Sequence, residues 1–395
     1  MQSRKKVFFA AIAICILFTI KGFGAVTNGE DLGPKQLDPA ELRDLYKLSR
    51  PELTAKLDAL PPLEAWRRAL VLGAINMDQK KIASAEEYFN LALKYVAGST
   101  YAQERVSTLF PLAFAQFMKG DQQKGLEYLL QAKSIVDSNM VRDEKIKITL
   151  LIELGEAYYR LGMYKDSLEV YQEADKTAQT LNNELLSAKC KMGLGYAYIK
   201  LGINLDKAQD LMVAACEVYK KNKMTADAAE ALKCLGNIES GSDLDKAQEF
   251  YVKALVLYKE CEDDHGQGNC HFNLGLLCKD KGRYDKALEH LNSALYFFSR
   301  SGSPTGNGIS QLAMGQTYIL MKKFPEAKAA LDQASSLLER SQSWDRLGET
   351  EESLGDLAAA QDDREKANSY YKKAVERFNG LKLSDRADAT EKKIR

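Results

Sequence analysis

An alanine returns at a near-constant interval along this chain, and that interval constrains the fold more than any other feature. Successive alanines stand about 40 positions apart, and a small residue precedes each of them by seven positions. The alanines are Ala92, Ala132, Ala174, Ala215, Ala254, Ala294, Ala334 and Ala374. A period between about 20 and 50 residues is typical of stacked arrays, in which one unit cannot bury its apolar face alone. The period therefore predicts a solenoid of similar units.

Each interval contains two segments with helical periodicity. The first carries a small residue, such as Gly155 or Gly315, and the second carries a bulky apolar residue three positions before the alanine, such as Tyr171. Spacings of three, four and seven place these residues on one face of each helix. Small residues on both helices let the two backbones approach closely. Composition agrees with an all-α protein, since 45% of residues are hydrophobic and only 8 are prolines.

Short motifs within these segments resemble the tetratricopeptide repeat family over roughly residues 66–380. Leu154-Gly155-x-x-Tyr158 and Gly315-x-x-Tyr318 stand where the family has Leu-Gly-x-x-Tyr. The period of about 40 residues, instead of about 34, resembles extended-helix members such as Pins-type adaptors, kinesin light chains and Rap-type bacterial peptide receptors. The resemblance implies a right-handed superhelical solenoid of about eight helix-turn-helix units with capping helices.

The N-terminus has the pattern of a secretory signal peptide over residues 1–24. Basic residues precede an apolar run over residues 7–20, and small residues follow it. Spanning a bilayer takes about 20 apolar residues, so this shorter run favours cleavage over a retained membrane anchor. We therefore expect an exported chain, periplasmic if the source is bacterial, that contacts a membrane only if the signal segment is retained.

Composition and breaks in periodicity predict the remaining boundaries. Asp38-Pro39 has the pattern of a helix start, and Pro61-Pro62 separates this region from the first repeat. The predicted segments are a flexible linker over residues 25–36, N-terminal capping helices over 37–61, a solenoid of eight repeats over 62–381 and a C-terminal capping helix over 382–395.

The family resemblance also implies a concave groove lined by the first helix of each unit. Positions counted from the Leu-Gly pair place mostly apolar and aromatic residues there, which are typical of binding surfaces. The candidate groove residues are Leu70, Met77, Phe110, Phe114, Phe117, Met118, Ile152, Tyr159, Met192, Tyr196, Ile199, Phe272, Leu276, Leu312 and Ile319. We expect this strip to bind a partner peptide or amphipathic helix. The alternative is that superhelical curvature or the N-terminal segment covers it.

Polar residues interrupt the strip in two units. The fifth carries Lys233, Asn237 and Ser240, and the eighth is acidic, with Glu349, Glu352 and Asp356. Some family members clamp a peptide carboxylate with Lys and Asn on successive repeats, and Lys233, Asn237 and Asn273 match that pattern. The last two positions fall on Ile309 and Ala313, which cannot donate to a carboxylate. The sequence thus argues against a carboxylate clamp.

Cysteine and histidine gather in one turn between repeats. Cys261, His265, Cys270 and His271 are residue types that bind zinc, but their spacing matches no standard finger. We expect an ordinary polar turn, with a Cys261–Cys270 disulfide as the next alternative and a metal site last.

Several function classes lack their sequence signatures. Lys and Arg total 55 and Asp and Glu total 55, so no basic footprint for nucleic acid is present. No P-loop, dinucleotide fingerprint, nucleophile elbow or His-Glu-x-x-His motif occurs, and we expect neither catalysis nor a cofactor. The expected function is a non-enzymatic interaction scaffold of the cell envelope or secretory space. The alternatives are a ligand-responsive peptide sensor and an accessory subunit of an envelope complex.

Overall fold

The computed structural model describes residues 39–394, and every regular element in that range is helical. The predicted signal peptide over 1–24 and linker over 25–36 lie outside the described residues. The chain divides into two compact units between Ala215 and Cys216, inside one helix, and each unit is described by itself. The all-α array of helix-turn-helix repeats predicted from the alanine period is confirmed.

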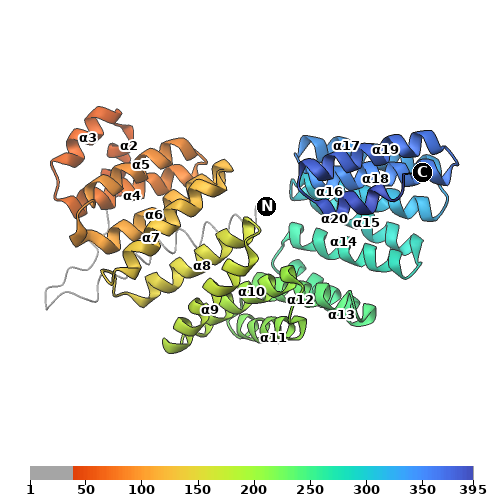
Figure 1. The fold of residues 1–395 in the computed structure, drawn as a ribbon. Coiled ribbons are helices and arrows are strands. Elements are labelled where there is room, and N and C mark those ends of the chain that lie inside the picture. The colour runs from red at the N-terminus through yellow and green to blue at the C-terminus, as the bar shows by residue number, and fades with distance from the viewer. Residues whose placement is uncertain (1–38, 395) are drawn as a thin grey trace. The chain divides into compact units, whose positions relative to one another are not determined.

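The N-terminal unit begins with two short helices, α2 (Pro39–Lys47) and α3 (Arg50–Asp58). Antiparallel pairs follow (Figure 1). They are α4 (Pro62–Asp78) with α5 (Ile82–Tyr95), α6 (Ala102–Lys119) with α7 (Gln122–Asp137), α8 (Glu144–Arg160) with α9 (Tyr164–Thr180), and α10 (Glu184–Leu201) with α11 (Leu205–Lys221). A 3-10 turn over Ser99–Tyr101 precedes α6. The unit boundary falls within α11.

The C-terminal unit continues the pairing. It contains α12 (Thr225–Glu239) with α13 (Leu244–Glu260), α14 (Asp264–Asp280) with α15 (Tyr284–Arg300), α16 (Pro304–Leu320) with α17 (Phe324–Arg340), and α18 (Trp344–Ala360) with α19 (Arg364–Gly380). A short helix, α20 (Ser384–Glu391), packs on α19.

A left-handed residue follows each helix of the C-terminal unit from α13 to α19. These evenly spaced residues are Glu262, Gly282, Gly302, Lys322, Gln342, Asp362 and Lys382. At the end of α14, the Gly282 N–H donates to Lys279 O (2.9 Å) and the Arg283 N–H donates to Cys278 O (2.8 Å), which is a Schellman cap. Helices of 17 residues joined by short, equal turns thus produce the period seen in the sequence. Gly241, which lies in the turn after α12, is not left-handed.

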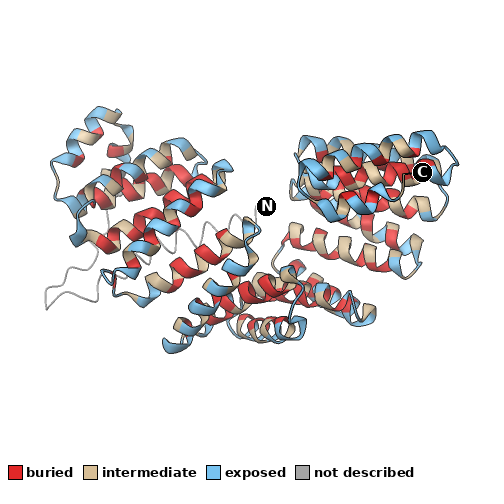
Figure 2. Ribbon diagram, viewed as in Figure 1, coloured by how far each residue is buried: buried red, intermediate tan, exposed pale blue. Residues whose placement is uncertain are grey.

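The repeat alanines lie at the closest helix contacts. All eight are 0% exposed, and in Figure 2 the buried face of each helix meets its pair. A Cβ added at Gly155 would lie 2.7 Å from the Tyr171 ring, and one added at Gly355 would lie 2.5 Å from the Tyr371 ring. Only glycine fits at these positions, because a Cβ and the ring cannot share that space.

Candidate functional site

The structure corrects four of the predicted groove residues. Leu70 and Met77 on α4, Met192 on α10 and Leu312 on α16 are 1, 3, 7 and 4% exposed. The first helix of the next repeat covers this kind of position: Leu70 and Met77 share a core cluster with Leu112 of α6. Side chains buried to this degree cannot contact a partner of the folded chain, so their assignment to the groove is wrong.

The remaining groove candidates are half-buried, and four of them on α6 also pack internally. Phe110 and Phe117 lie against the second-repeat core, and Phe114 and Met118 lie against the first. A Cβ added at Gly125 of α7 would lie 2.1 Å from the Phe117 ring, so this phenylalanine faces its own helix pair. The half-buried candidates are Phe110, Phe114, Phe117, Met118, Ile152, Tyr159, Tyr196, Ile199, Phe272, Leu276 and Ile319.

Tyrosines join successive first helices at the surface of α8 and α10. The ring centroids of Tyr159 on α8 and Tyr196 on α10 are 5.8 Å apart. Tyr164, at the start of α9, lies 5.5 Å from Tyr159. Tilted aromatic contacts of this kind hold rings in fixed positions, and tyrosine is favoured at binding surfaces. We call Glu153, Glu156, Tyr159 and Tyr196 the α8–α10 surface.

Two carboxylates, Glu153 and Glu156, lie on α8 within two turns of Tyr159. Glu156 accepts a hydrogen bond from Arg160 (2.8 Å), whereas Glu153 has no hydrogen bond or ion pair with any residue in the described range. Burial, with a smaller contribution from Glu156, raises the pKa of Glu153 to about 7, and Lys189 and Arg160 oppose the shift. Near neutral pH this carboxyl is therefore only partly ionised, and a nearby cation would favour its charged form. Glu153 is not among the residues predicted from the sequence, because burial of a carboxyl leaves no pattern there.

The polar residues of the fifth unit bind one another. The Asn237 side-chain oxygen accepts hydrogen bonds from Tyr251 Oη (2.9 Å) and from Asn273 Nδ2 (3.1 Å). Lys233 Nζ donates to Glu230 (2.6 Å), and this lysine side chain is 12% exposed. The lysine charge is thus compensated within the chain, which agrees with the argument against a carboxylate clamp.

The acidic residues of the eighth unit also have partners. Lys393 pairs with Glu352 (2.8 Å) and with Asp356 (2.9 Å). Arg386 of α20 pairs with Glu349 (2.6 Å). The C-terminal segment thus covers the acidic face of α18 with basic side chains, so this face is not an open part of the predicted groove.

The cysteine and histidine turn is not a disulfide site. None of the six cysteines in residues 39–394 is paired, so the Cys261–Cys270 alternative is wrong. In the same range no three His, Cys, Asp or Glu side chains are placed to share a metal ion. His271 Nδ1 instead lies 3.2 Å from His290 Nδ1, and burial lowers the pKa of His271 to about 4. No sequence motif indicates this pair, because the two residues lie on different helices.

No helix of the described chain is both long enough and apolar enough to cross a membrane.

Comparisons with known proteins agree with the geometry. Residues 227–298 match the family model "Tetratricopeptide repeat". Protein KINESIN LIGHT CHAIN-RELATED 3 of Arabidopsis thaliana is 21% identical over 242 residues, which are 60% of this chain. The match spans 31% of that plant protein's length.

Solved structures resemble this chain along most of its length. The apo quorum sensor NprR of B. thuringiensis has a TM-score of 0.65 and 15% identity, with 87% of this chain and 94% of NprR covered. A Rap protein complexed with Competence and Sporulation Factor has a TM-score of 0.56 and 16% identity, with 90% and 96% covered. At these identities the likeness concerns the fold alone.

Proposed function

We propose that this chain, a member of the tetratricopeptide repeat family, is a non-enzymatic scaffold that holds a partner peptide or helix on its α8–α10 surface. The observation that carries the proposal is Glu153, a half-buried carboxyl that forms no hydrogen bond or ion pair within the described range, on the helix that bears Tyr159. The quorum sensor NprR and the Rap protein bound to Competence and Sporulation Factor share the fold, which supports a role in recognition.

The chemistry of the surface selects a basic partner residue. The raised pKa of Glu153 means that ionisation is unfavourable in the unbound chain. A lysine or arginine placed beside this carboxyl restores its charged form and forms a charge-assisted hydrogen bond. The rings of Tyr159 and Tyr196, which contact each other, offer faces for a cation or for an apolar neighbour of the same partner segment. We therefore infer that the partner segment combines a basic residue with an apolar one.

Site-specific crosslinking in the native source tests this proposal. A photoreactive phenylalanine at position 196 should capture a neighbouring protein, whereas the same group at position 296, an exposed tyrosine on α15, should not. The double variant Tyr159→Ala, Tyr196→Ala should then bind the captured partner at least tenfold more weakly, while Tyr296→Ala binds normally. Thermal unfolding checks that both variants are folded. A partner that binds the double variant as tightly as the parent would refute the model.

A ligand-responsive sensor is the second candidate, favoured by the fold shared with the quorum sensor NprR. A scaffold keeps its shape when the partner segment binds, whereas a sensor changes it. Solution scattering with and without that segment separates the two: an unchanged radius of gyration supports the scaffold, and a change supports the sensor.

We also propose that the chain is exported and loses residues 1–24. The support is the basic and then apolar pattern of that segment. N-terminal sequencing of the protein from its native source should begin near residue 25, in a periplasmic or secreted fraction. A cytosolic protein that retains Met1 would contradict this proposal.

A further inference from the structure

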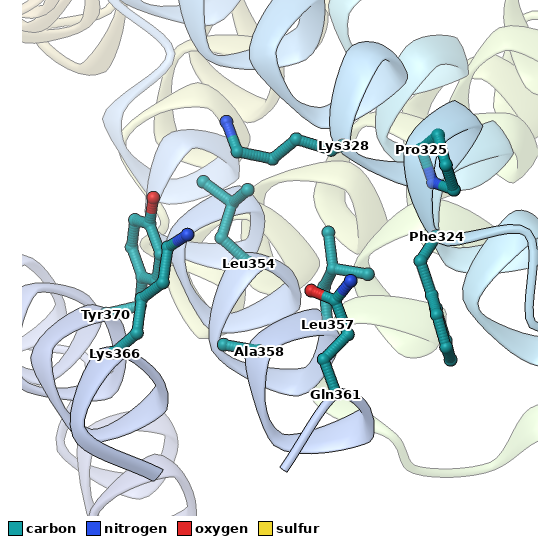
Figure 3. A pocket seen from close by; sticks show the side chains of 9 residues that line it. All are labelled: Phe324, Pro325, Lys328, Leu354, Leu357, Ala358, Gln361, Lys366 and Tyr370. Atoms are coloured by element: carbon teal, nitrogen blue, oxygen red, sulfur yellow. The ribbon is translucent and has the colours of Figure 1, made fainter. Parts of the chain in front are cut away.

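A cavity of about 160 Å³ lies in the C-terminal unit, on the second-helix side of the last two repeats. Figure 3 shows α18 contributing its floor and the starts of α17 and α19 contributing its walls. The lining residues are Phe324, Pro325, Lys328, Leu354, Leu357, Ala358, Gln361, Lys366 and Tyr370. We call this the α17–α19 cavity. It involves none of the residues of the α8–α10 surface.

The repeat register shows how this place differs from the preceding repeat. Helices α16 and α17 have the same lengths and turns as α18 and α19, with every bound shifted by one repeat period. Ala358 therefore occupies the position of Tyr318, whose ring packs against the core of its own repeat. Replacing a tyrosine by alanine removes a phenol group, and well-packed interiors relax only partly around such a deletion. The eighth repeat also has Tyr370 where the seventh has Ala330, so the cavity lies between a small residue on α18 and a ring on α19.

The lining combines an apolar floor with cationic groups. Leu354 and Leu357 lie at the base, and the two ammonium groups of Lys328 and Lys366 lie on one side of the cavity in Figure 3. Lys328 pairs with Asp332, but Lys366 forms no ion pair with any residue of the described range. The preceding repeat has Leu288 and Glu326 at the positions of these lysines. Other repeats carry lysine at the position of Lys366, as Lys246 and Lys286 do, so the charge that sets this repeat apart is that of Lys328.

We propose that the α17–α19 cavity binds a benzene-sized apolar group that carries a carboxylate. An apolar cavity of roughly 150 Å³ is large enough to hold benzene. Lys366 supplies a charge-assisted hydrogen bond to the carboxylate, and Gln361 and the Tyr370 hydroxyl add neutral polar contacts. An apolar lining with a few convergent polar groups is typical of small-ligand sites. A free aryl or alkyl carboxylic acid and the C-terminal residue of a peptide present the same chemistry.

Calorimetric titration of the full chain tests the proposal with 3-phenylpropionate and its neutral amide as probes. The acid should bind saturably, and the amide should bind at least tenfold more weakly, because it lacks the charge that Lys366 recognises. A tetrapeptide ending in phenylalanine, with a free or an amidated C-terminus, forms the second arm. Tighter binding of the free-carboxylate peptide than of 3-phenylpropionate identifies a peptide end as the source, and the reverse order identifies a small acid.

Two variants replace cavity residues with their counterparts in the preceding repeat. Ala358→Tyr places a ring in the cavity, as Tyr318 stands at this position in the seventh repeat, and Lys366→Glu introduces the charge of Glu326. Each should abolish binding of both acid probes. Lys366 is exposed, so Lys366→Glu tests the charge without disturbing the core even if Ala358→Tyr folds poorly. Lys372→Glu, an exposed charge reversal outside the lining, is the matched control and should bind normally.

The proposal fails if neither 3-phenylpropionate nor the free-carboxylate peptide binds the parent chain. It also fails if acid and amide bind equally, or if Lys366→Glu binds as the parent does. None of these outcomes depends on the α8–α10 surface, so they leave the proposed scaffold function untouched.

Discussion

The first helices α8 and α18 differ in how far basic side chains of the chain itself pair with their carboxylates. On α18, Lys393 and Arg386 of the C-terminal segment neutralise Glu352, Asp356 and Glu349. On α8, Glu153 has no ion pair within the described residues, and burial holds its pKa near 7. The two helices occupy equivalent places in their repeats, but Ser353 stands at the position of Glu153, so the difference comes from where the carboxylates stand as well as from what covers them. A face covered by the chain's own cap is electrostatically satisfied, whereas the face of α8 gains from an outside cation.

Deleting the C-terminal segment that covers α18 should have the largest effect on stability. Deleting residues 382–395 exposes Phe378, which is 0% exposed in the intact chain, and leaves the three α18 carboxylates without their basic partners from the C-terminal segment. Loss of one buried phenylalanine contact alone costs about 2 kcal/mol, so we expect the C-terminal unit to lose about 3 kcal/mol or more.

Trp344 on α18 reports that loss in a Trp66→Phe background, since the chain has only 2 tryptophans. The midpoint of guanidinium unfolding, followed by Trp344 fluorescence, should shift to a lower denaturant concentration in the truncated chain. In a Trp344→Phe background, Trp66 should report an unchanged N-terminal unit. An unaltered Trp344 transition would mean that α20 does not stabilise α18.

The close contacts at the glycines of α8 and α18 should contribute equally to stability, although the charges on the two helices differ. Gly155→Ala and Gly355→Ala place a Cβ 2.7 and 2.5 Å from the rings of Tyr171 and Tyr371. Overpacking of this kind costs about 2 kcal/mol, and we expect similar losses at the two sites in denaturant unfolding. Gly380→Ala, where a Cβ meets nothing within 4 Å, is the control and should cost far less. A large difference between the two sites would show that the repeats are not packed alike.

Glu153→Gln should stabilise the chain only at higher pH. The pKa of Glu153 is raised from 4.5 to about 7 on folding, so the folded chain prefers the protonated carboxyl. The stability that this preference provides is complete below about pH 4.5 and is lost as the pH rises through 7. Because the side chain is half-buried, we expect a gain of about 1 kcal/mol at pH 8 and none at pH 4. Equal effects at both pH values would show that ionisation of Glu153 is not responsible.

The smallest expected effect is that of Lys393→Met. The variant keeps the apolar stem but leaves Glu352 and Asp356 without their shared cation. With 38% of the lysine side chain exposed, the loss should be at most about 1 kcal/mol. It should shrink in about 1 M salt, which screens a partly exposed ion pair. A loss that persists at high salt would assign the effect to side-chain packing instead of charge.

Local spacing predicted the fold because the contacts that define it are local. Ala174, Gly155 and Tyr171 belong to one helix pair, so their spacing suffices to place them at the helix crossing. The open surface depends on contacts between repeats, which spacing does not reveal. Leu70 has a groove position in the register, but α6 buries it. Comparison of one repeat with the next does not reveal the α17–α19 cavity either, because the small Ala358 is accompanied by Tyr370 where the preceding repeat has Ala330.

The left-handed turns recur at one interval both inside and between repeats. The connections between helices in this part of the chain are therefore interchangeable. Excising residues 304–343 would join Ser303 to Trp344, and the Gly302 turn would then lead into a first helix as it does now. Neighbouring units would meet through equivalent faces, because each repeat contacts mainly its neighbours. Excising one helix and its turn, residues 304–323, would leave the joints intact but place a second helix where a first helix belongs. The array can therefore gain or lose units in steps of two helices, and the number of repeats is a variable that such a chain can change without redesigning its turns.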